Sequence, residues 1–161
     1  MADRVKQFFQ PKGRRPLQMA GERLAVSLLH GNWTYFPSLC WRTDAMRRHG
    51  FRLDQRIVLD LSLQLALIVD GASLIVDDEV VFLYRRHDSV SSWSGSGAAR
   101  FFEERALFEE FAATAARLGW KRAARAARLH LTSRLNALAQ LPAALVTRRG
   151  LREVISHALR P

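Results

Sequence analysis

Two short segments of this 161-residue chain hold residue types that could act on a charged substrate. In residues 81–92, VFLYRRHDSVSS, two arginines, a histidine and several serines directly follow an apolar run. Arginine binds phosphate oxygens through paired hydrogen bonds, and serine hydroxyls add neutral donors. A neutral histidine can ligate a metal ion that itself holds a diphosphate. The candidate phosphate-binding residues are Arg85, Arg86, His87, Ser89 and Ser91, although a polar turn after a strand has the same composition.

The second segment is centred on Asp60, an acid flanked by leucines. An unpaired carboxylate is costly to bury. Asp60 therefore either begins a helix, where it faces the positive end of the helix dipole, or acts as a general base. The pair Asp77–Asp78 also has two interpretations, as metal ligands or as a solvated connection after a strand.

A third candidate is the aromatic segment GNWTYFPSLCWR, residues 31–42. Its aromatic residues are Trp33, Tyr35, Phe36 and Trp41. They could form a stacking surface for a sugar or a lipid tail, or they could belong to the core. Cys40 lies among apolar neighbours, so we expect it to be a small core residue.

The chain has an ordinary apolar content and a strongly basic charge. Its length and its apolar fraction of 48% suit one globular domain with a real core. The net charge of +10, from 25 Lys+Arg against 15 Asp+Glu, favours an anionic partner such as nucleic acid, acidic lipid or a phosphorylated substrate. A biased genomic composition explains the same excess. Lys121, Arg125 and Arg128 share one face of a predicted helix.

The sequence contains no motif that would indicate export, zinc binding or a nucleotide-binding loop. The first residues lack the apolar core of a signal peptide, and no apolar run approaches the roughly 20 residues that span a bilayer. We therefore expect a cytoplasmic location. The sequence has one cysteine, no zinc-ligand spacing, no glycine-rich phosphate loop and no nucleophile elbow.

Local patterns predict the elements that would position these candidates. Residues 1–16 read as a basic flexible arm, broken by proline and glycine. The predicted helices of the first half are 18–30, a short helix after Thr43 that ends at Gly50, and 57–70. Leucines alternate in 57–70, which also suits a strand, but the run is long and rich in helix formers. Residues 32–41 are expected to be extended, and one or two strands are expected in 73–86.

After SGSG, residues 94–97, every pattern is helical. One apolar stripe contains Phe101, Phe108, Phe111, Ala115 and Leu118, and ends at Gly119. A second contains Trp120, Ala124, Ala127, Leu131 and Leu138. We expect a break at Pro142 and a last helix over about 151–159.

The order of these segments resembles the acceptor-side, C-terminal portion of glycosyltransferase family 2 enzymes, which have the GT-A fold. The resemblance covers about residues 20–92. The first matching motif is Ser38 and Arg42, followed by a short helix and Gly50–Phe51. Next come Leu59–Asp60 at the start of a helix, then Gly71, and finally Tyr84 to His87 with Ser89 to Ser92. The family has two acids where this chain has Leu59–Asp60, so only the second is present.

The resemblance implies a role for each candidate. Asp60 would be the general base, and Asn32, Trp33, Ser38 and Arg42 would lie on the acceptor side. His87, Arg85, Arg86 and Ser89 would face the donor diphosphate, with His87 as a metal-side ligand. The implied partners are a nucleotide-sugar and a glycan or lipid-linked acceptor of envelope or polysaccharide synthesis. The implied cofactor is Mg²⁺ or Mn²⁺, held in the family by a D-x-D motif that these 161 residues lack.

The expected fold class is therefore α/β. Residues 17–93 would form a partial GT-A-like region with an incomplete parallel sheet, and residues 98–161 a helical C-terminal region. The nucleotide-binding half would be lost by truncation or by a misplaced start, or supplied by another chain. Two alternatives stay open: an accessory subunit of another transferase, or a non-catalytic basic helical protein that binds nucleic acid or anionic membrane through residues 117–134. Nucleic acid is the less favoured partner, and the basic tail suggests contact with the inner face of the membrane.

Overall fold

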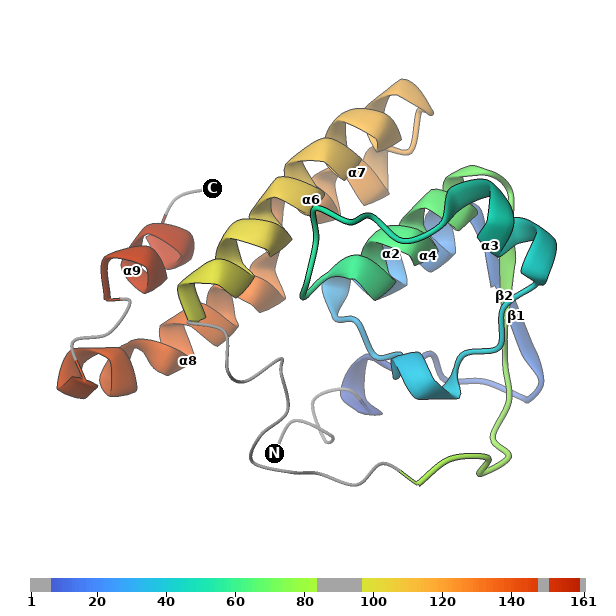
Figure 1. Cartoon of the computed structure of the whole chain (residues 1–161), viewed down its shortest axis with the longest axis horizontal. Coiled ribbons are helices and arrows are strands. Elements are labelled where there is room, and N and C mark those ends of the chain that lie inside the picture. Colours follow the sequence, from blue (N-terminus) through green and yellow to red (C-terminus); the bar gives the residue numbers. More distant parts are fainter. Residues whose placement is uncertain (1–6, 84–96, 148–150, 160–161) are drawn as a thin grey trace.

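The computed structural model describes residues 7–83, 97–147 and 151–159. The molecule is mostly helical, with one small sheet at one end and the last helix at the other (Figure 1). The mixed α/β class expected from the sequence is present only in this coarse sense. The phosphate-binding candidates Arg85, Arg86, His87, Ser89 and Ser91 lie outside the described residues.

The elements follow one another from a strand to a helical C-terminal region. The first part contains β1 (Leu17–Ala20), α2 (Gly21–His30), the 3-10 turn η1 (Phe36–Ser38), α3 (Thr43–His49), α4 (Leu59–Val69) and β2 (Ser73–Val76). The second part contains α6 (Gly97–Arg117), α7 (Lys121–Leu129), α8 (Leu131–Thr147) and α9 (Leu151–Leu159). No helix among the described residues is long and apolar enough to cross a membrane.

The sheet is an antiparallel pair of β1 and β2, in which Leu17 lies opposite Val76. The described residues therefore contain no parallel pairing, unlike the sheet that the resemblance implies. The predicted helix from residue 18 was wrong over its first turn, because Leu17–Ala20 pair with β2 instead. Helix α2 begins at Gly21, whose φ of 53° is a conformation that glycine adopts without strain.

The main core contains residues from both sides of the composition change at 94–97. Its most buried large side chains are Leu24, Leu28, Leu29 and Leu65, from α2 and α4. Phe108 and Phe111 of α6 and the alanines of α7 belong to the same cluster. The small alanine side chains let α7 approach its neighbours α2 and α6 closely. The C-terminal helices therefore complete the core of the first half.

Helix α4 is confirmed, and its burial explains why its sequence was ambiguous. Leu61 and Leu65 point into the main core, while Leu63 and Leu67 pack with Ala45 of α3 in a separate cluster. A helix that is covered on several sides has apolar residues all round and loses the one-sided pattern of a surface helix. The alternating leucines thus reflect burial on two sides of a helix.

The helical C-terminal region differs from its predicted form at two places. The expected continuous helix after Trp120 is divided at His130, a non-glycine residue with a φ of 28°. Pro142 lies inside α8 and does not end it. Because the chain turns at His130, α8 directs Ser133 and Ala137 inward, and Leu131 and Leu138 are exposed. Leu118, the end of the first predicted stripe, is also exposed.

Candidate functional site

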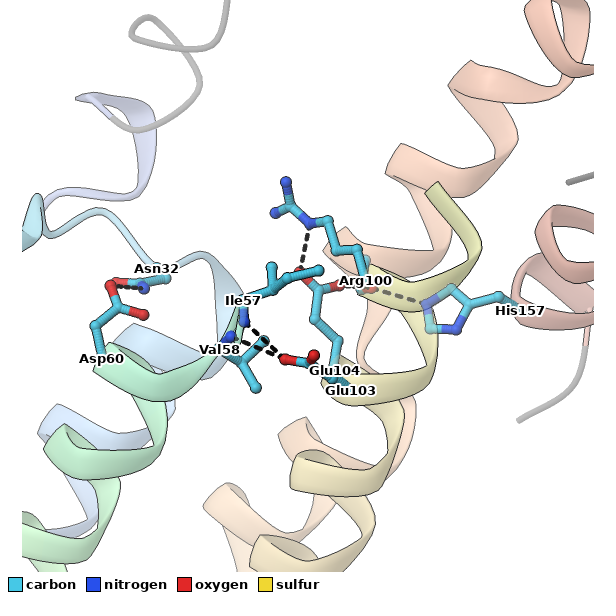
Figure 2. A network of polar contacts seen from close by, with 9 residues as sticks. Asn32, Ile57, Val58, Asp60, Arg100, Glu103, Glu104 and His157 are labelled. Atoms are coloured by element: carbon cyan, nitrogen blue, oxygen red, sulfur yellow. Dashed lines mark hydrogen bonds and ion pairs between the residues drawn. The ribbon is translucent and has the colours of Figure 1, made fainter. Parts of the chain in front are cut away.

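Asp60 lies in the first turn of α4 with a half-buried side chain. Its Oδ1 accepts a hydrogen bond from the backbone N–H of Leu61, at 2.8 Å. The side-chain amide of Asn32 donates to the other oxygen, Oδ2, at 3.4 Å (Figure 2). The structure thus brings together two residues that the sequence analysis placed on the acceptor side and at the base, 28 positions apart.

A buried hydrogen-bonded chain holds Asn32 in place. The hydroxyl of Thr34 donates to Asn32 Oδ1 at 2.7 Å, and the side-chain amide of Gln64 lies 3.1 Å from that hydroxyl. The same Gln64 amide is 3.3 Å from the backbone carbonyl of Asp60. Thr34 and Gln64 are each only 5% exposed. The network therefore fixes the aromatic segment against the first turn of α4.

The sequence analysis missed Thr34 and Gln64, although a signal for one of them was present. Gln64 interrupts a run of leucines on a helix that the pattern already predicted. A polar side chain inside such a run is buried, and a buried amide needs hydrogen-bond partners. The identity of the partner, Thr34, depends on tertiary packing alone.

A carboxylate of α6 caps the start of α4. Glu103 Oε2 accepts from the backbone N–H groups of Ile57 and Val58, at 2.7 and 3.4 Å (Figure 2). It also accepts from the backbone N–H of Arg56, at 3.1 Å. Helix α4 has no capping side chain of its own. An acceptor and a negative charge at a helix N-terminus both stabilise it. The position of Asp60, two residues further on, is therefore set from the C-terminal half of the chain.

The other acceptor-side candidates take different places. Trp33 is buried, and its indole N–H donates to Ser27 Oγ at 3.1 Å, so it supports the core. Ser38 is exposed and donates to the carbonyl of Tyr35 within η1, at 2.8 Å. Arg42 is exposed before α3, with its Nε 3.3 Å from Asp44 Oδ1. These three residues do not share the hydrogen-bonded network of Asp60 and Asn32 in the described part of the chain.

Two phenylalanine rings near this segment form an exposed aromatic surface that the sequence analysis did not predict. Phe36 and Phe51 are partly exposed, and their rings meet edge to face with centroids 5.7 Å apart. Edge-to-face contact is a favoured arrangement of aromatic rings. The pair leaves apolar ring surface open to a ligand beside η1 and the Gly50 turn.

The structure also places Cys40 and the pair Asp77–Asp78. Cys40 is exposed, so its expected place in the core was wrong. Residues 36–38 just before it are exposed, and its two neighbours Leu39 and Trp41 are only partly buried. Asp77 and Asp78 are exposed, and Asp78 pairs with Arg15 at 2.9 Å. This favours the solvated connection over a metal-binding pair.

The described residues do not fit the divalent metal that the resemblance implies. No group of three His, Cys, Asp or Glu side chains that could hold a metal ion occurs within residues 7–83, 97–147 and 151–159. The D-x-D motif is also missing from the sequence.

A second polar network links α6, α8 and α9, and it is structural. Ser133 Oγ contacts Glu104 Oε2 and lies 2.8 Å from His157 Nε2. Arg100 pairs with Glu104 at 2.9 Å (Figure 2). A Ser–His–acid catalytic triad needs the carboxylate on the histidine and the serine open to substrate. Here the carboxylate contacts the serine, and Ser133 and His157 are both buried.

The two histidines of this region are held in their neutral form. Burial lowers the pKa of His157, and the nearby His130 lowers it further. Burial is also the main reason that the pKa of His130 lies below its usual value. The two rings lie 5.3 Å apart, and Phe101 stacks on His157 at 4.5 Å. A positive charge on either ring would be poorly solvated and close to the other ring.

Comparisons with protein-family models, with curated protein sequences and with solved structures gave no match for this chain. The function of the chain is therefore inferred from the motifs of the sequence and from the geometry of the Asp60 site.

Proposed function

We propose that this chain is the acceptor-side part of a family 2 glycosyltransferase and that Asp60 is its general base. The observation that carries the proposal is the contact between Asn32 and Asp60, at the start of the helix on which the motif order predicts the base. Asp60 is half-buried, so its carboxylate has both a fixed position and access to solvent. A positioned carboxylate within reach of a hydroxyl proton is what general-base catalysis needs.

The proposed reaction transfers a sugar from a nucleotide-sugar to a hydroxyl of a glycan or lipid-linked acceptor. The acceptor oxygen forms a bond to the anomeric carbon as the bond from that carbon to the diphosphate oxygen breaks. The bonding electrons leave with the nucleoside diphosphate, and the acceptor proton moves to Asp60. Asn32 orients the carboxylate through one oxygen, and Leu61 N–H holds the other. The carboxylate keeps further lone pairs for the acceptor hydroxyl.

The donor side of this proposal depends on residues beyond the described ones. Arg85, Arg86, His87 and Ser89 would bind the departing diphosphate, whose charge guanidinium groups match well. The reaction also needs a nucleotide-binding half with D-x-D, in the same or in another polypeptide, because these 161 residues contain no such motif. The chain would then supply the base and the acceptor surface.

The first test is made on the product of the whole reading frame in which these residues lie. The DNA of this reading frame is first read for an in-frame segment that encodes D-x-D. The encoded protein is then assayed for release of nucleoside diphosphate with a panel of sugar donors and acceptors. We expect Asp60→Asn to lower transfer by about 10²- to 10⁴-fold, the usual contribution of a general base. Donor binding should stay unchanged, because Asp60 does not contact the nucleotide in the proposal.

The matched control is Asp70→Asn, at the other end of α4 and about 15 Å from Asp60. This variant should keep most of the transfer activity. Equal activity of Asp60→Asn and of the unchanged protein would overturn the role of the base. A reading frame without D-x-D, in a product that shows no transfer alone or with its co-purifying proteins, would favour the accessory-subunit alternative.

A further inference from the structure

Nearly all of the net charge of the chain is concentrated in one stretch. Residues 111–152 contain nine Lys/Arg residues and no Asp or Glu. The remaining residues contain 16 Lys/Arg and 15 Asp/Glu, so this stretch carries nine of the ten net positive charges. It includes all of α7 and α8. A field of this kind attracts polyanionic partners over a distance of about 10 Å at moderate salt.

Helix α7 divides its residues sharply between a buried and a charged face. Its alanines pack into the main core, and its cationic side chains Lys121, Arg122, Arg125 and Arg128 are all exposed. None of these four takes part in an ion pair within the described residues. Glu22 of α2 accepts the backbone N–H groups of Arg122 and Ala123, which fixes the N-terminus of the helix. The four cations therefore extend from a rigid support.

Helix α8 presents an apolar stripe to solvent. Leu131, Leu135, Leu138 and Leu145 recur at helical spacing on the side opposite the inward-facing Ser133 and Ala137. These leucines are between 41% and 62% exposed. An exposed row of large apolar side chains marks a contact surface more often than a lone exposed leucine does. In this structure no segment of the described chain covers the stripe.

We propose that α7 and α8 together dock on an anionic lipid bilayer, independently of the transferase function. We call this pair of faces the basic–leucine surface: Lys121, Arg122, Arg125 and Arg128 with Leu131, Leu135, Leu138 and Leu145. Lipid phosphates match the cations, and the acyl boundary matches the leucines, as in amphipathic helices that lie in the membrane interface.

Other occupants account for only part of this surface. Nucleic acid would match the cations by counterion release but would leave the leucines in water. A second copy of the chain could cover the leucines, but it would bring two strongly basic stretches together. A bilayer with acidic headgroups explains both halves of the basic–leucine surface at once.

The test is flotation of the full chain with vesicles of phosphatidylcholine alone, or of phosphatidylcholine mixed with phosphatidylglycerol. We expect binding to the anionic vesicles only, and a weaker affinity at higher salt. The triple variant Arg122→Gln, Arg125→Gln and Arg128→Gln should bind about a hundredfold more weakly, at about fivefold per cation lost near the surface. Leu135→Ser with Leu138→Ser should lower binding by about tenfold or more.

Matched controls separate the surface from total charge and from folding. The variant Arg14→Gln, Arg47→Gln and Arg56→Gln removes the same charge from exposed sites elsewhere and should bind anionic vesicles almost as well as the unchanged chain. Helical circular dichroism checks the fold of every variant.

Three results would overturn the proposal. The first is equal binding to neutral and anionic vesicles. The second is tight binding to duplex DNA or RNA that the leucine changes leave intact, together with no binding to vesicles. The third is a dimer in light scattering that has no vesicle affinity and that disappears with the leucine changes.

Discussion

Asp60 begins a helix, as one interpretation of its sequence context predicted, and the proposed role as a base depends on how its carboxylate is held. It lies in the first turn of α4, where the helix dipole favours a negative charge. It is also held by Asn32 and left half-exposed, as a base requires. The buried pair Thr34 and Gln64 connects the two elements behind it. Breaking such a pair leaves one polar group buried without a partner, which costs about 1–3 kcal/mol.

The paired histidines lead to a prediction about pH. Both His130 and His157 have a pKa below the usual 6.5, so the unfolded chain takes up protons before the folded one as the pH falls. Their contribution to stability is complete above the unfolded pKa and is lost as the pH falls through it toward the lowered folded pKa. We expect the melting temperature to fall between about pH 7.5 and about pH 5.5.

The measurement is a series of thermal melts of the unchanged protein and of the double variant His130→Gln and His157→Gln. The double variant should show a smaller fall over the same pH range, because it keeps amide groups that do not titrate. The pKa of Asp54, lowered by a hydrogen bond from Arg52, affects stability only at more acid pH. An identical pH slope in the two proteins would show that the histidines are not the cause.

Among the elements, α4 and α7 share an unusual dependence on carboxylates from distant helices. Neither helix has a capping side chain of its own. Glu103 of α6 caps α4, and Glu22 of α2 caps α7. Capping of this kind leaves no local pattern in the sequence. Glu103 lies 46 positions from the N–H group of Ile57, and Glu22 lies 100 positions from that of Arg122. It also joins the ends of helices that belong to the same core cluster.

We predict that Glu103→Ala lowers the free energy of unfolding by about 1–2 kcal/mol, because the amides at the start of α4 lose their acceptor. Urea unfolding followed by circular dichroism measures the change. Glu109→Ala on the exposed side of α6 is the matched control and should change stability by less than about 0.5 kcal/mol. A loss no larger than that of the control would contradict the capping role.

For the whole molecule, the shared core predicts a single cooperative unfolding of α2, α4, α6 and α7. Residues of all four helices belong to one apolar cluster. Phe111→Ala should therefore lower the free energy of unfolding of this unit as a whole, by about 3–5 kcal/mol. Tryptophan fluorescence and circular dichroism are followed through the same urea titration. Coincident midpoints, both shifted by the substitution, are expected.

Separate midpoints would contradict the shared core. Trp33 and Trp120 report on its two halves, because they come from opposite sides of the composition change at residues 94–97. Single-tryptophan variants that keep one or the other would then unfold at different urea concentrations.

The sequence by itself determined the features that depend on neighbours along the chain. The ends of α3 and α6 follow from Gly50 and Gly119, whose φ values are positive, and Gly31 directly follows α2. Helix α9 was predicted at its observed bounds. Helix α4 also followed from propensity and length, against a pattern of alternating leucines. These signals are local, because they come from backbone conformation and helix propensity.

Only the tertiary structure decided the features that depend on distant partners. The pairing of β1 with β2 removed a predicted helical turn, and the turn at His130 exposed leucines that the pattern placed inside. The contact of Asn32 with Asp60 and the cap from Glu103 join residues 28 and 46 positions apart. Packing selects such pairs by the burial of side chains and the pairing of polar groups in three dimensions, which no local pattern records.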